Sequence, residues 1–188
     1  MHRFSQQGLT LIELLITISI MSIIATLSIG SFHWIVERSS AASTRSNIER
    51  TFSLARFIAV TEQTIVTICP LDTSNKCVND WSLPTAVFRD PGSALKLTDT
   101  SKLLRSIYLS PRGTLTPSNS FFGPRKYFQY QSDGSVRGTL GNFTWCPESG
   151  NRKAATHVRI NFGGRLIWSR DYSGNQIVET SSGADVSC

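Results

Sequence analysis

Residues 9–36 read LTLIELLITISIMSIIATLSIGSFHWIV, and this stretch decides the fold of the N-terminal part of the chain. Glu13 is its one charged residue, it contains no proline, and its single glycine, Gly30, stands near the far end. At about 1.5 Å per residue, a helix of this length crosses a bilayer. The eight residues before it are mostly polar and include His2 and Arg3. The sequence therefore predicts a membrane-embedded helix behind a short leader.

Two rival interpretations of this N-terminus explain less. A secretory signal peptide has a shorter apolar region and ends at a small-x-small cleavage site, whereas this run continues into a helical pattern. An ordinary signal anchor does not explain Glu13, because a carboxylate within a membrane costs at least about 2.5 kcal/mol. Cleavage after Gly8 would supply a partner, since it frees an α-amine at Leu9 that can pair with Glu13. Such a pair favours docking of one helix against another in a fixed axial register.

Residues 8–13, GLTLIE, followed by the long apolar run, resemble the signature of type IV prepilins. The resemblance implies that a prepilin peptidase removes residues 1–8 and that Leu9 becomes N-methylated. The family usually has phenylalanine at this position, so Leu9 is a departure from its pattern. The resemblance also implies single-pass insertion of residues 9–36 in the bacterial inner membrane with the head in the periplasm. Assembly with other pilin or pseudopilin subunits into a pilus or pseudopilus then follows.

Helical periodicity continues beyond residue 36. Four apolar residues recur at i, i+4, i+7 and i+11, a spacing that places them on one face of a helix: Ile48, Phe52, Ala55 and Ala59. Four charged residues lie mainly off this face: Arg45, Glu49, Arg50 and Arg56. We therefore expect one helix from about residue 9 to about residue 60, whose soluble half, residues 37–62, packs its apolar stripe on a sheet.

Residues 63–188 have the pattern of a β-rich head. Seven segments rich in β-branched or aromatic residues are expected to be strands: 64–69, 86–88, 106–109, 127–130, 143–146, 157–162 and 165–169. Ser132-Asp133-Gly134 and Gly163-Gly164 are typical of hairpin turns. The segment 110–125 contains Pro111, Pro117 and Pro124 and is expected to be a loop.

Short patterns in the head resemble the FimT/GspH group of minor pilins and pseudopilins. In chain order they are Ile68-Cys69-Pro70, Cys77, Trp81, Val87–Asp90, the aromatic-x-x-Asp-Gly turn Tyr130–Gly134, Phe143–Cys146, Val158–Asn161 and Gly163–Arg165. They follow the prepilin start in the order typical of that group and cover nearly the whole chain. The resemblance implies an α+β, pilin-like fold, in which a long N-terminal helix packs on an antiparallel β-rich head.

The chain has 4 cysteines, an even number that suggests two disulfides in a small exported domain. Three pairings are possible. We favour Cys69–Cys77, which closes a short loop, and Cys146–Cys188, which ties down a Ser/Gly-rich tail. A zinc site is disfavoured because there is no Cys-x-x-Cys motif and the histidines are not spaced as ligand pairs.

No catalytic constellation stands out in the sequence. It contains no Gly-x-Ser-x-Gly motif, no phosphate-binding loop and no dinucleotide fingerprint. Asp72, Asp80 and Asp90 surround the first cysteine pair, and aspartates in such a turn-rich region usually stabilise turns. We therefore expect no catalytic residues, no metal, no cofactor and no enzymatic activity.

Nucleic-acid binding is a sharper hypothesis for the basic C-terminal region. The chain carries a formal net charge of +6, and five basic residues gather in its last quarter: Arg152, Lys153, Arg159, Arg165 and Arg170. Trp168 and Tyr172 stand among them and offer surfaces for base stacking. Some FimT-like minor pilins take up DNA through a Gly-Arg-x-Arg motif. Residues 164–167 read GRLI here, so the second arginine is absent, and Arg165 is equally compatible with a structural role in a hairpin.

The sequence thus favours a minor pilin that helps to initiate or cap a type IV pilus. The first alternative is a GspH-like pseudopilin of a type II secretion system, which would assemble through the same interactions but serve a different cargo. A DNA-binding minor pilin for DNA uptake is the second. The expected partners are other pilin or pseudopilin subunits, the prepilin peptidase, the inner membrane and, in the last case, DNA.

Overall fold

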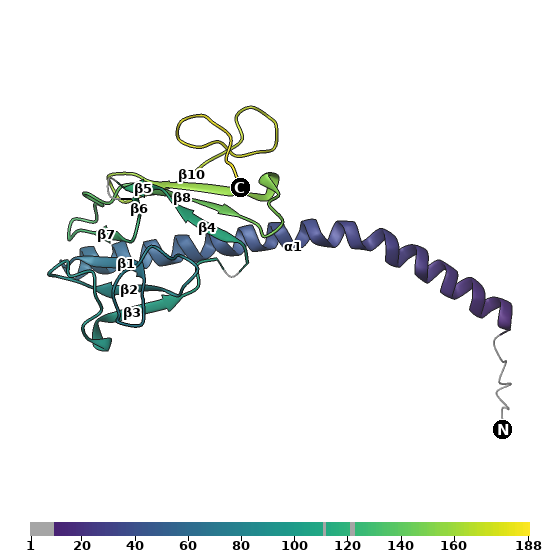
Figure 1. Cartoon of the computed structure of the whole chain (residues 1–188), viewed down its shortest axis with the longest axis horizontal. Coiled ribbons are helices and arrows are strands. Elements are labelled where there is room, and N and C mark those ends of the chain that lie inside the picture. Colours follow the sequence, from purple (N-terminus) through teal and green to yellow (C-terminus); the bar gives the residue numbers. More distant parts are fainter. Residues whose placement is uncertain (1–9, 111, 121–122) are drawn as a thin grey trace, which may run out of the picture. The chain divides into compact units, whose positions relative to one another are not determined.

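One long helix begins the described part of the chain. The computed structural model describes residues 10–110, 112–120 and 123–188, without the side chains of residues 27–31. Helix α1 spans Leu11–Thr61, 51 residues, close to the predicted limits (purple to blue in Figure 1). Gly8 and Leu9, the predicted processing residues, lie outside the described residues. The chain divides into an N-terminal unit that ends at Glu37 and a head, Arg38–Cys188.

The predicted apolar stripe of α1 is buried in the head. Ile48 and Phe52 are each 1% exposed, and Ala55 and Ala59 are fully buried. Because the stripe repeats at helical spacing, one face of α1 is buried against the strands. The small alanines let strands approach this end of the helix, while Phe52 fills the space further along.

The first sheet has four antiparallel strands in the order β3-β2-β1-β7. Their bounds are β1 Val66–Pro70, β2 Thr85–Arg89, β3 Leu103–Ile107 and β7 Phe128–Tyr130. All five residues of β1 are buried, as expected for a central strand rich in β-branched residues. A short 3₁₀ helix, Thr100–Lys102, leads into β3.

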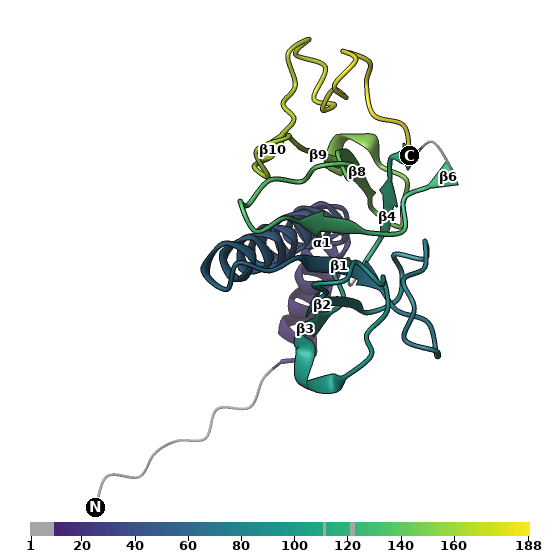
Figure 2. The same ribbon diagram turned by 90° about the vertical axis from the view of Figure 1, so that its left-hand side faces the viewer.

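The second sheet also has four antiparallel strands, in the order β10-β9-β8-β4. Their bounds are β4 Thr114–Pro117, β8 Gly141–Cys146, β9 Thr156–Ile160 and β10 Leu166–Trp168. A small ribbon, β5 Asn119–Ser120 with β6 Gly123–Pro124, and a 3₁₀ helix, Arg152–Ala154, complete the head. In Figure 2 the first sheet lies below the second, and the C-terminal part of α1 runs alongside both.

Two sequence predictions about the strands are corrected. The segment 110–125 is not simply a loop, because β4 pairs with β8 and sets Leu115 opposite Trp145. Leu115 is only 6% exposed, so burial of one side chain outweighs the low strand propensity of the prolines around it. Pro117 ends β4 at the edge of the sheet, where its missing N–H is tolerated. The strand predicted at 106–109 instead occupies Leu103–Ile107.

The two predicted turns have different roles. The Gly163-Gly164 turn joins β9 to β10 as a hairpin, with Ile160 opposite Leu166. The turn at residues 132–134 is closed by the N–H of Gln131, which donates to the carbonyl of Ser135. It does not lead into a second strand of the same sheet, because the N–H of Val136 then donates to Phe162 next to β9.

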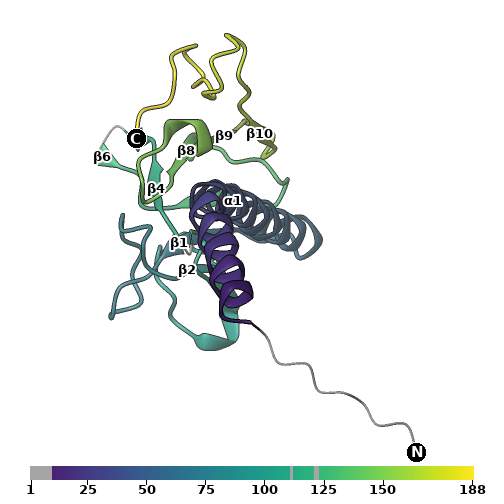
Figure 3. The same cartoon turned by 90° about the vertical axis from the view of Figure 1, so that its right-hand side faces the viewer.

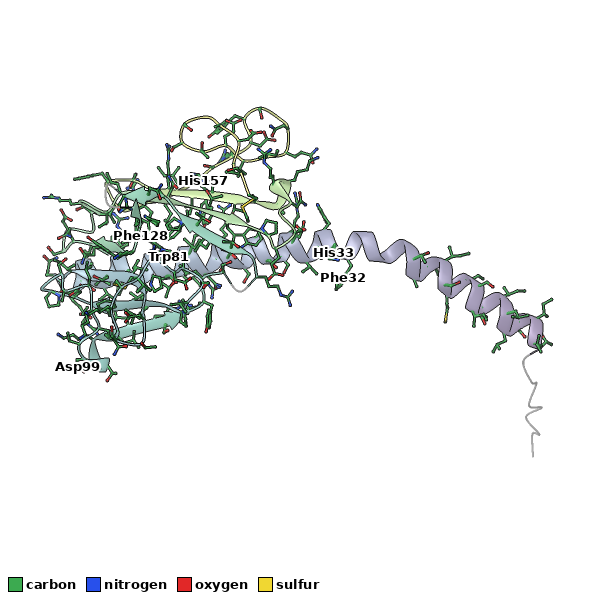
Figure 4. All side chains as sticks on the ribbon, in the orientation of Figure 1. Phe32, His33, Trp81, Asp99, Phe128 and His157 are labelled. Carbon is green, nitrogen blue, oxygen red and sulfur yellow. A yellow bond between two sulfur atoms is a disulfide. The ribbon has the colours of Figure 1, made fainter. Side chains whose placement is uncertain are left out.

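An aromatic cluster fills the space between the helix and the two sheets. The ring of Phe52 lies 5.5 Å from Phe128 of the first sheet and 6.1 Å from Phe143 of the second, centroid to centroid. Trp81 comes from the loop between β1 and β2 and lies 4.7 Å from Phe143 and 5.8 Å from Phe128, beside which it is drawn in Figure 4. One helix residue thus links both sheets in the main core, while a smaller cluster around Phe88 lies apart from it.

Candidate functional site

The N-terminal unit presents an apolar helix whose first turn carries Glu13. The backbone N–H of Glu13 donates to the carbonyl oxygen of Thr10 at 3.1 Å, and it lies 3.4 Å from the Thr10 hydroxyl oxygen. Thr10 therefore caps the helix. A carboxylate in the first turn is also favoured by the helix dipole. The Thr10 cap and the helix dipole both favour an acidic side chain in this first turn, independently of any partner.

Most large apolar side chains described in this unit are exposed. They include Leu11, Ile12, Leu14, Leu15, Ile16, Ile18, Ile20, Met21, Ile23, Ile24, Phe32, Trp34 and Ile35. Apolar surface of this extent is unusual on a monomeric soluble protein and marks a binding surface. Within the described residues, no helix combines the length and the hydropathy needed to cross a membrane.

The first disulfide anchors a loop in which aspartates stabilise turns. Cys69, in β1, is bonded to Cys77, one of the two predicted pairings. The Asp72 carboxylate accepts hydrogen bonds from the N–H and hydroxyl of Ser74 and from the N–H of Lys76. These bonds, first that from Lys76, hold the pKa of Asp72 below its ordinary value. Asp80 binds Ser82 in the same manner.

Asp90 is a buried structural group, consistent with a turn-stabilising role. Its carboxylate accepts from the Thr67 hydroxyl at 2.9 Å and from the backbone N–H groups of Ala94 and Leu95. Gln129 donates in turn to the Thr67 hydroxyl at 3.0 Å. These contacts fix the loop after β2 to the first sheet. All three aspartates thus bind groups of their own turns, as expected from the turn-rich sequence around them.

The second disulfide, Cys146–Cys188, fastens the C-terminal tail, residues 171–188, and is also the predicted pairing. Arg152 reinforces the attachment, because its Nε donates to the Val186 carbonyl at 2.8 Å and its guanidinium lies 3.5 Å from Asp185. Figures 1 and 3 show the tail (yellow) on the side of the second sheet that faces away from α1. The tail thus covers part of the outer face of that sheet.

His157 lies buried on this outer face, near the point where the tail loops meet the sheet (Figure 4). Its Nδ1 is 3.0 Å from the Thr144 hydroxyl on the neighbouring strand, and its Nε2 has no hydrogen-bond partner among the described residues. Burial, followed by the charge of Arg159, lowers the pKa of His157. The side chain is therefore a neutral part of the structure at pH 7. No cluster of metal-binding side chains occurs among the residues described.

The five basic residues of the C-terminal region do not form one patch. Arg159 of β9 stands opposite Ile167 of β10. Together with Trp168 and Tyr172 it lines a groove of about 280 Å³ between β10 and the tail, which we call the tail groove. Arg165 lines a different hollow, against α1. Arg152 is engaged with the tail, as described above, and Lys153 and Arg170 are exposed elsewhere.

The hollow that contains Arg165 includes a residue that sequence reasoning did not single out. Arg56 of α1 lines it together with Glu49 and Ser53 from the helix and Trp168 from β10. The spacing of the apolar stripe in α1 indicated only that Arg56 lies outside the buried face. Its place beside the β9–β10 turn depends on contacts between segments more than 100 residues apart, for which the local sequence carries no signal.

A β-rich head packed on the second half of a long helix, with an apolar first half that carries Glu13, defines the pilin-like class. Residues 45–164 match the family model described as Type II transport protein GspH. Residues 3–29 match the prokaryotic N-terminal methylation motif. The chain therefore belongs to the GspH family of minor pilins and pseudopilins.

A solved structure shows the same fold, and a second match is weaker. The type IV minor pilin FimU of Pseudomonas aeruginosa is 19% identical, with a TM-score of 0.56, over 82% of this chain and 98% of FimU. The minor pseudopilin EpsH of the Vibrio cholerae type 2 secretion system is 15% identical over 68% of this chain and 93% of EpsH, with a TM-score of 0.44. No curated protein matches the sequence. The predicted α+β, pilin-like fold is confirmed.

Proposed function

We propose that this protein is a minor pilin of a type IV pilus and acts in pilus initiation, assembly or tip formation. The exposed apolar side chains of α1, with Glu13 in its first turn, carry the proposal. Removal of residues 1–8 by a prepilin peptidase would create a free α-amine at Leu9, which is then methylated. Residues 9–36 would hold the protein in the inner membrane, with the head in the periplasm, until the helix docks among those of other subunits.

Glu13 would set the register of that docking. A carboxylate enclosed among apolar helices is strongly unfavourable unless an opposite charge pairs with it. A neighbouring subunit's α-amine would satisfy it only at one axial position, so wrong registers would be penalised. The apolar side chains would supply the contact area, and the single charge would supply the specificity.

A pseudopilin of a type II secretion system is the second candidate in the same class. It is favoured by the description of the matching family model, whereas the name of the FimU structure favours the pilus. Deleting the gene in its host separates the two. We expect fewer surface pili with unchanged secretion of exoproteins. Normal pili together with lost secretion would assign the protein to the secretion system.

Binding of DNA is a candidate additional function of the head. The observation that favours it is the tail groove, which Arg159 lines together with the 78% exposed Tyr172. Arginine can contact phosphates while aromatic rings stack on unpaired bases. Arg165, the residue that resembles the first arginine of the DNA-uptake motif, lines another hollow. A salt-dependent binding assay with the full chain tests this candidate.

A further inference from the structure

A hollow of about 400 Å³ lies on the head between α1 and the β9–β10 hairpin. We call it the helix groove. Glu49, Ser53 and Arg56 line it from α1, and Gly164, Arg165 and Trp168 line it from the hairpin. Every lining residue belongs to the head, so the groove is formed within one compact unit. It lies on the helix side of β10, whereas the tail groove lies on the side of the tail.

The helix groove carries two positive charges that the head does not neutralise. Its one carboxylate, Glu49, is already engaged by Arg45 at 3.1 Å, and Arg45 also lies 4.7 Å from the Trp168 ring centroid. In the part of the chain that is described, neither Arg56 nor Arg165 has a carboxylate within 4.0 Å. A groove with two unneutralised guanidinium groups favours an anion, and guanidinium matches a carboxylate in a bidentate geometry.

The walls of the helix groove are held in place from both sheets. The Tyr130 hydroxyl donates to the Gly164 carbonyl oxygen at 2.8 Å and fixes the hairpin relative to β7. Arg56 runs closely past Gly134, since a Cβ atom added there would lie 3.2 Å from the Arg56 Nε. The Arg56 stem is therefore supported by backbone, and less side-chain entropy is lost when it binds a ligand.

An apolar surface continues from the helix groove along α1. Phe57 and Val60 are 62% and 42% exposed and line an adjoining hollow together with Ser53, Arg56 and Thr61. Because both hollows share Ser53 and Arg56, the cationic and apolar parts form one surface. A purely ionic ligand would leave Phe57 and Val60 uncovered, whereas a polypeptide with both chemistries would cover them.

We propose that this composite surface binds a segment of a neighbouring filament subunit in which an aspartate or glutamate adjoins apolar side chains. The carboxylate would pair with Arg56 and Arg165, and the apolar side chains would cover Phe57 and Val60. We favour a protein partner over a nucleic acid because the apolar side chains of a polypeptide can cover both Phe57 and Val60. This inference rests on the proposed function, since it requires that the protein has filament neighbours.

Site-specific photo-crosslinking of the full chain in its native host tests the proposal. A benzophenone amino acid replaces Phe57, and the crosslinked residue of the partner is identified by mass spectrometry. We expect a filament subunit crosslinked within a few residues of an Asp or Glu. The double variant Arg56→Glu/Arg165→Glu should lower the crosslink yield about tenfold or more, as expected when one partner of a charge pair is reversed. Arg50→Glu, an exposed arginine of α1 outside the groove, is the matched control and should leave the yield unchanged.

Recovery of the protein in sheared filaments is measured in the same cells, so that failure of the binding surface can be distinguished from failure of the proposed function. Incorporation without a crosslink at Phe57, or with a crosslink that survives the double charge reversal, overturns the binding surface and leaves the filament role intact. A crosslink to DNA, to lipid or to a segment without an acidic residue also overturns it. Absence of the wild-type protein from every filament preparation instead contradicts the proposed function.

Discussion

The hydroxyl of Tyr130, at the end of β7, donates a 2.8 Å hydrogen bond to the backbone carbonyl oxygen of Gly164 in the β9–β10 turn. Since β7 belongs to the first sheet and the turn to the second, this bond links the two sheets of the head. Gly164 has φ +74°, and a Cβ atom there would lie 2.4 Å from the Gly134 carbonyl oxygen and 2.6 Å from Tyr130. Both the backbone angle and the close approach require glycine.

Replacing Gly164 by alanine should destabilise the head. The left-handed angle alone costs about 1 kcal/mol, and a clash with backbone cannot be relieved by a side-chain rotation. We expect the free energy of unfolding to fall by about 2 kcal/mol or more, measured by tryptophan fluorescence of the full chain in detergent during denaturation. Gly183→Ala is the control, because Gly183 has φ +83° but no atom within 4 Å of its added Cβ. Equal losses in the two variants would show that the contact between the sheets is not tight.

The two sheets and the helix differ in how far they could be predicted. The stripe Ile48, Phe52, Ala55 and Ala59 was predictable because burial of one helix face imposes a local period. Strand β4 was missed because it is defined by pairing with β8, which sets Leu115 opposite Trp145, 30 residues further along the chain. The prolines around β4 argued correctly against a central strand but not against an edge strand.

The candidate sites show the same division. The two disulfide pairings that we favoured among the three possible ones are present, whereas the role of Glu13 in assembly stays a prediction. By contrast, the five basic residues lie close together in sequence but are separated by the fold, which puts Arg159 in the tail groove and Arg165 in the helix groove. Arg56, which no motif marks, joins Arg165 because α1 packs beside the hairpin. Proximity in sequence therefore suggested a cluster of C-terminal basic residues that the fold does not form, and it gave no sign that Arg56 and Arg165 lie together.

Processing of the N-terminus is predicted to occur between Gly8 and Leu9. The reason is the match of residues 3–29 to the N-terminal methylation motif together with a glycine before the apolar run. Mass spectrometry of the membrane-extracted protein should show an N-terminal peptide that begins with Leu9 and is heavier by one methyl group. A Gly8→Leu variant, which removes the small residue at the cleavage point, should retain residues 1–8. A mature protein that begins at Met1 or within residues 25–35 would contradict the pilin assignment.

Replacement of Glu13 by alanine should impair filament incorporation without unfolding the protein. Loss of the carboxylate removes the charge that would select the docking register, and it makes insertion of the helix in a membrane easier rather than harder. We expect the Glu13→Ala protein to accumulate in the membrane fraction at normal levels and to be depleted from sheared filaments. Glu148→Ala, which removes an exposed carboxylate of the head, should be recovered like the wild type. Equal recovery of both variants would remove Glu13 from the docking step.

Stability of the head should decrease between neutral and mildly acidic pH because of His157. Burial and the charge of Arg159 lower its pKa in the folded state, whereas an unfolded histidine has a pKa of about 6.5. Below that pH the unfolded chain takes up a proton that the folded chain excludes, so stability falls, by up to about 1.4 kcal/mol per pH unit. His157→Gln should abolish this decline between pH 7 and 5 in thermal melts, while His33→Gln, at an exposed position of α1, should retain it. A decline that persists in His157→Gln would assign it to other groups.

Any binding of DNA by this protein should be weak, independent of sequence and centred on the tail groove. Arg159 would contact phosphates there, while the 78% exposed Tyr172 would stack on a base. Affinity should fall with salt by about 0.7 log units per phosphate contact for each decade of salt on single strands and about 0.9 on duplexes.

Arg159→Ala should reduce that slope by about one contact, and Tyr172→Ala should weaken binding to single strands more than to duplexes, because only unpaired bases can stack. Arg165→Ala, on the other side of β10, and Arg50→Ala should change little, and fluorescence anisotropy of labelled oligonucleotides at several salt concentrations measures all four. A larger loss in Arg165→Ala than in Arg159→Ala would place the DNA in the helix groove, and absence of binding at low salt would leave the protein with its role in assembly alone.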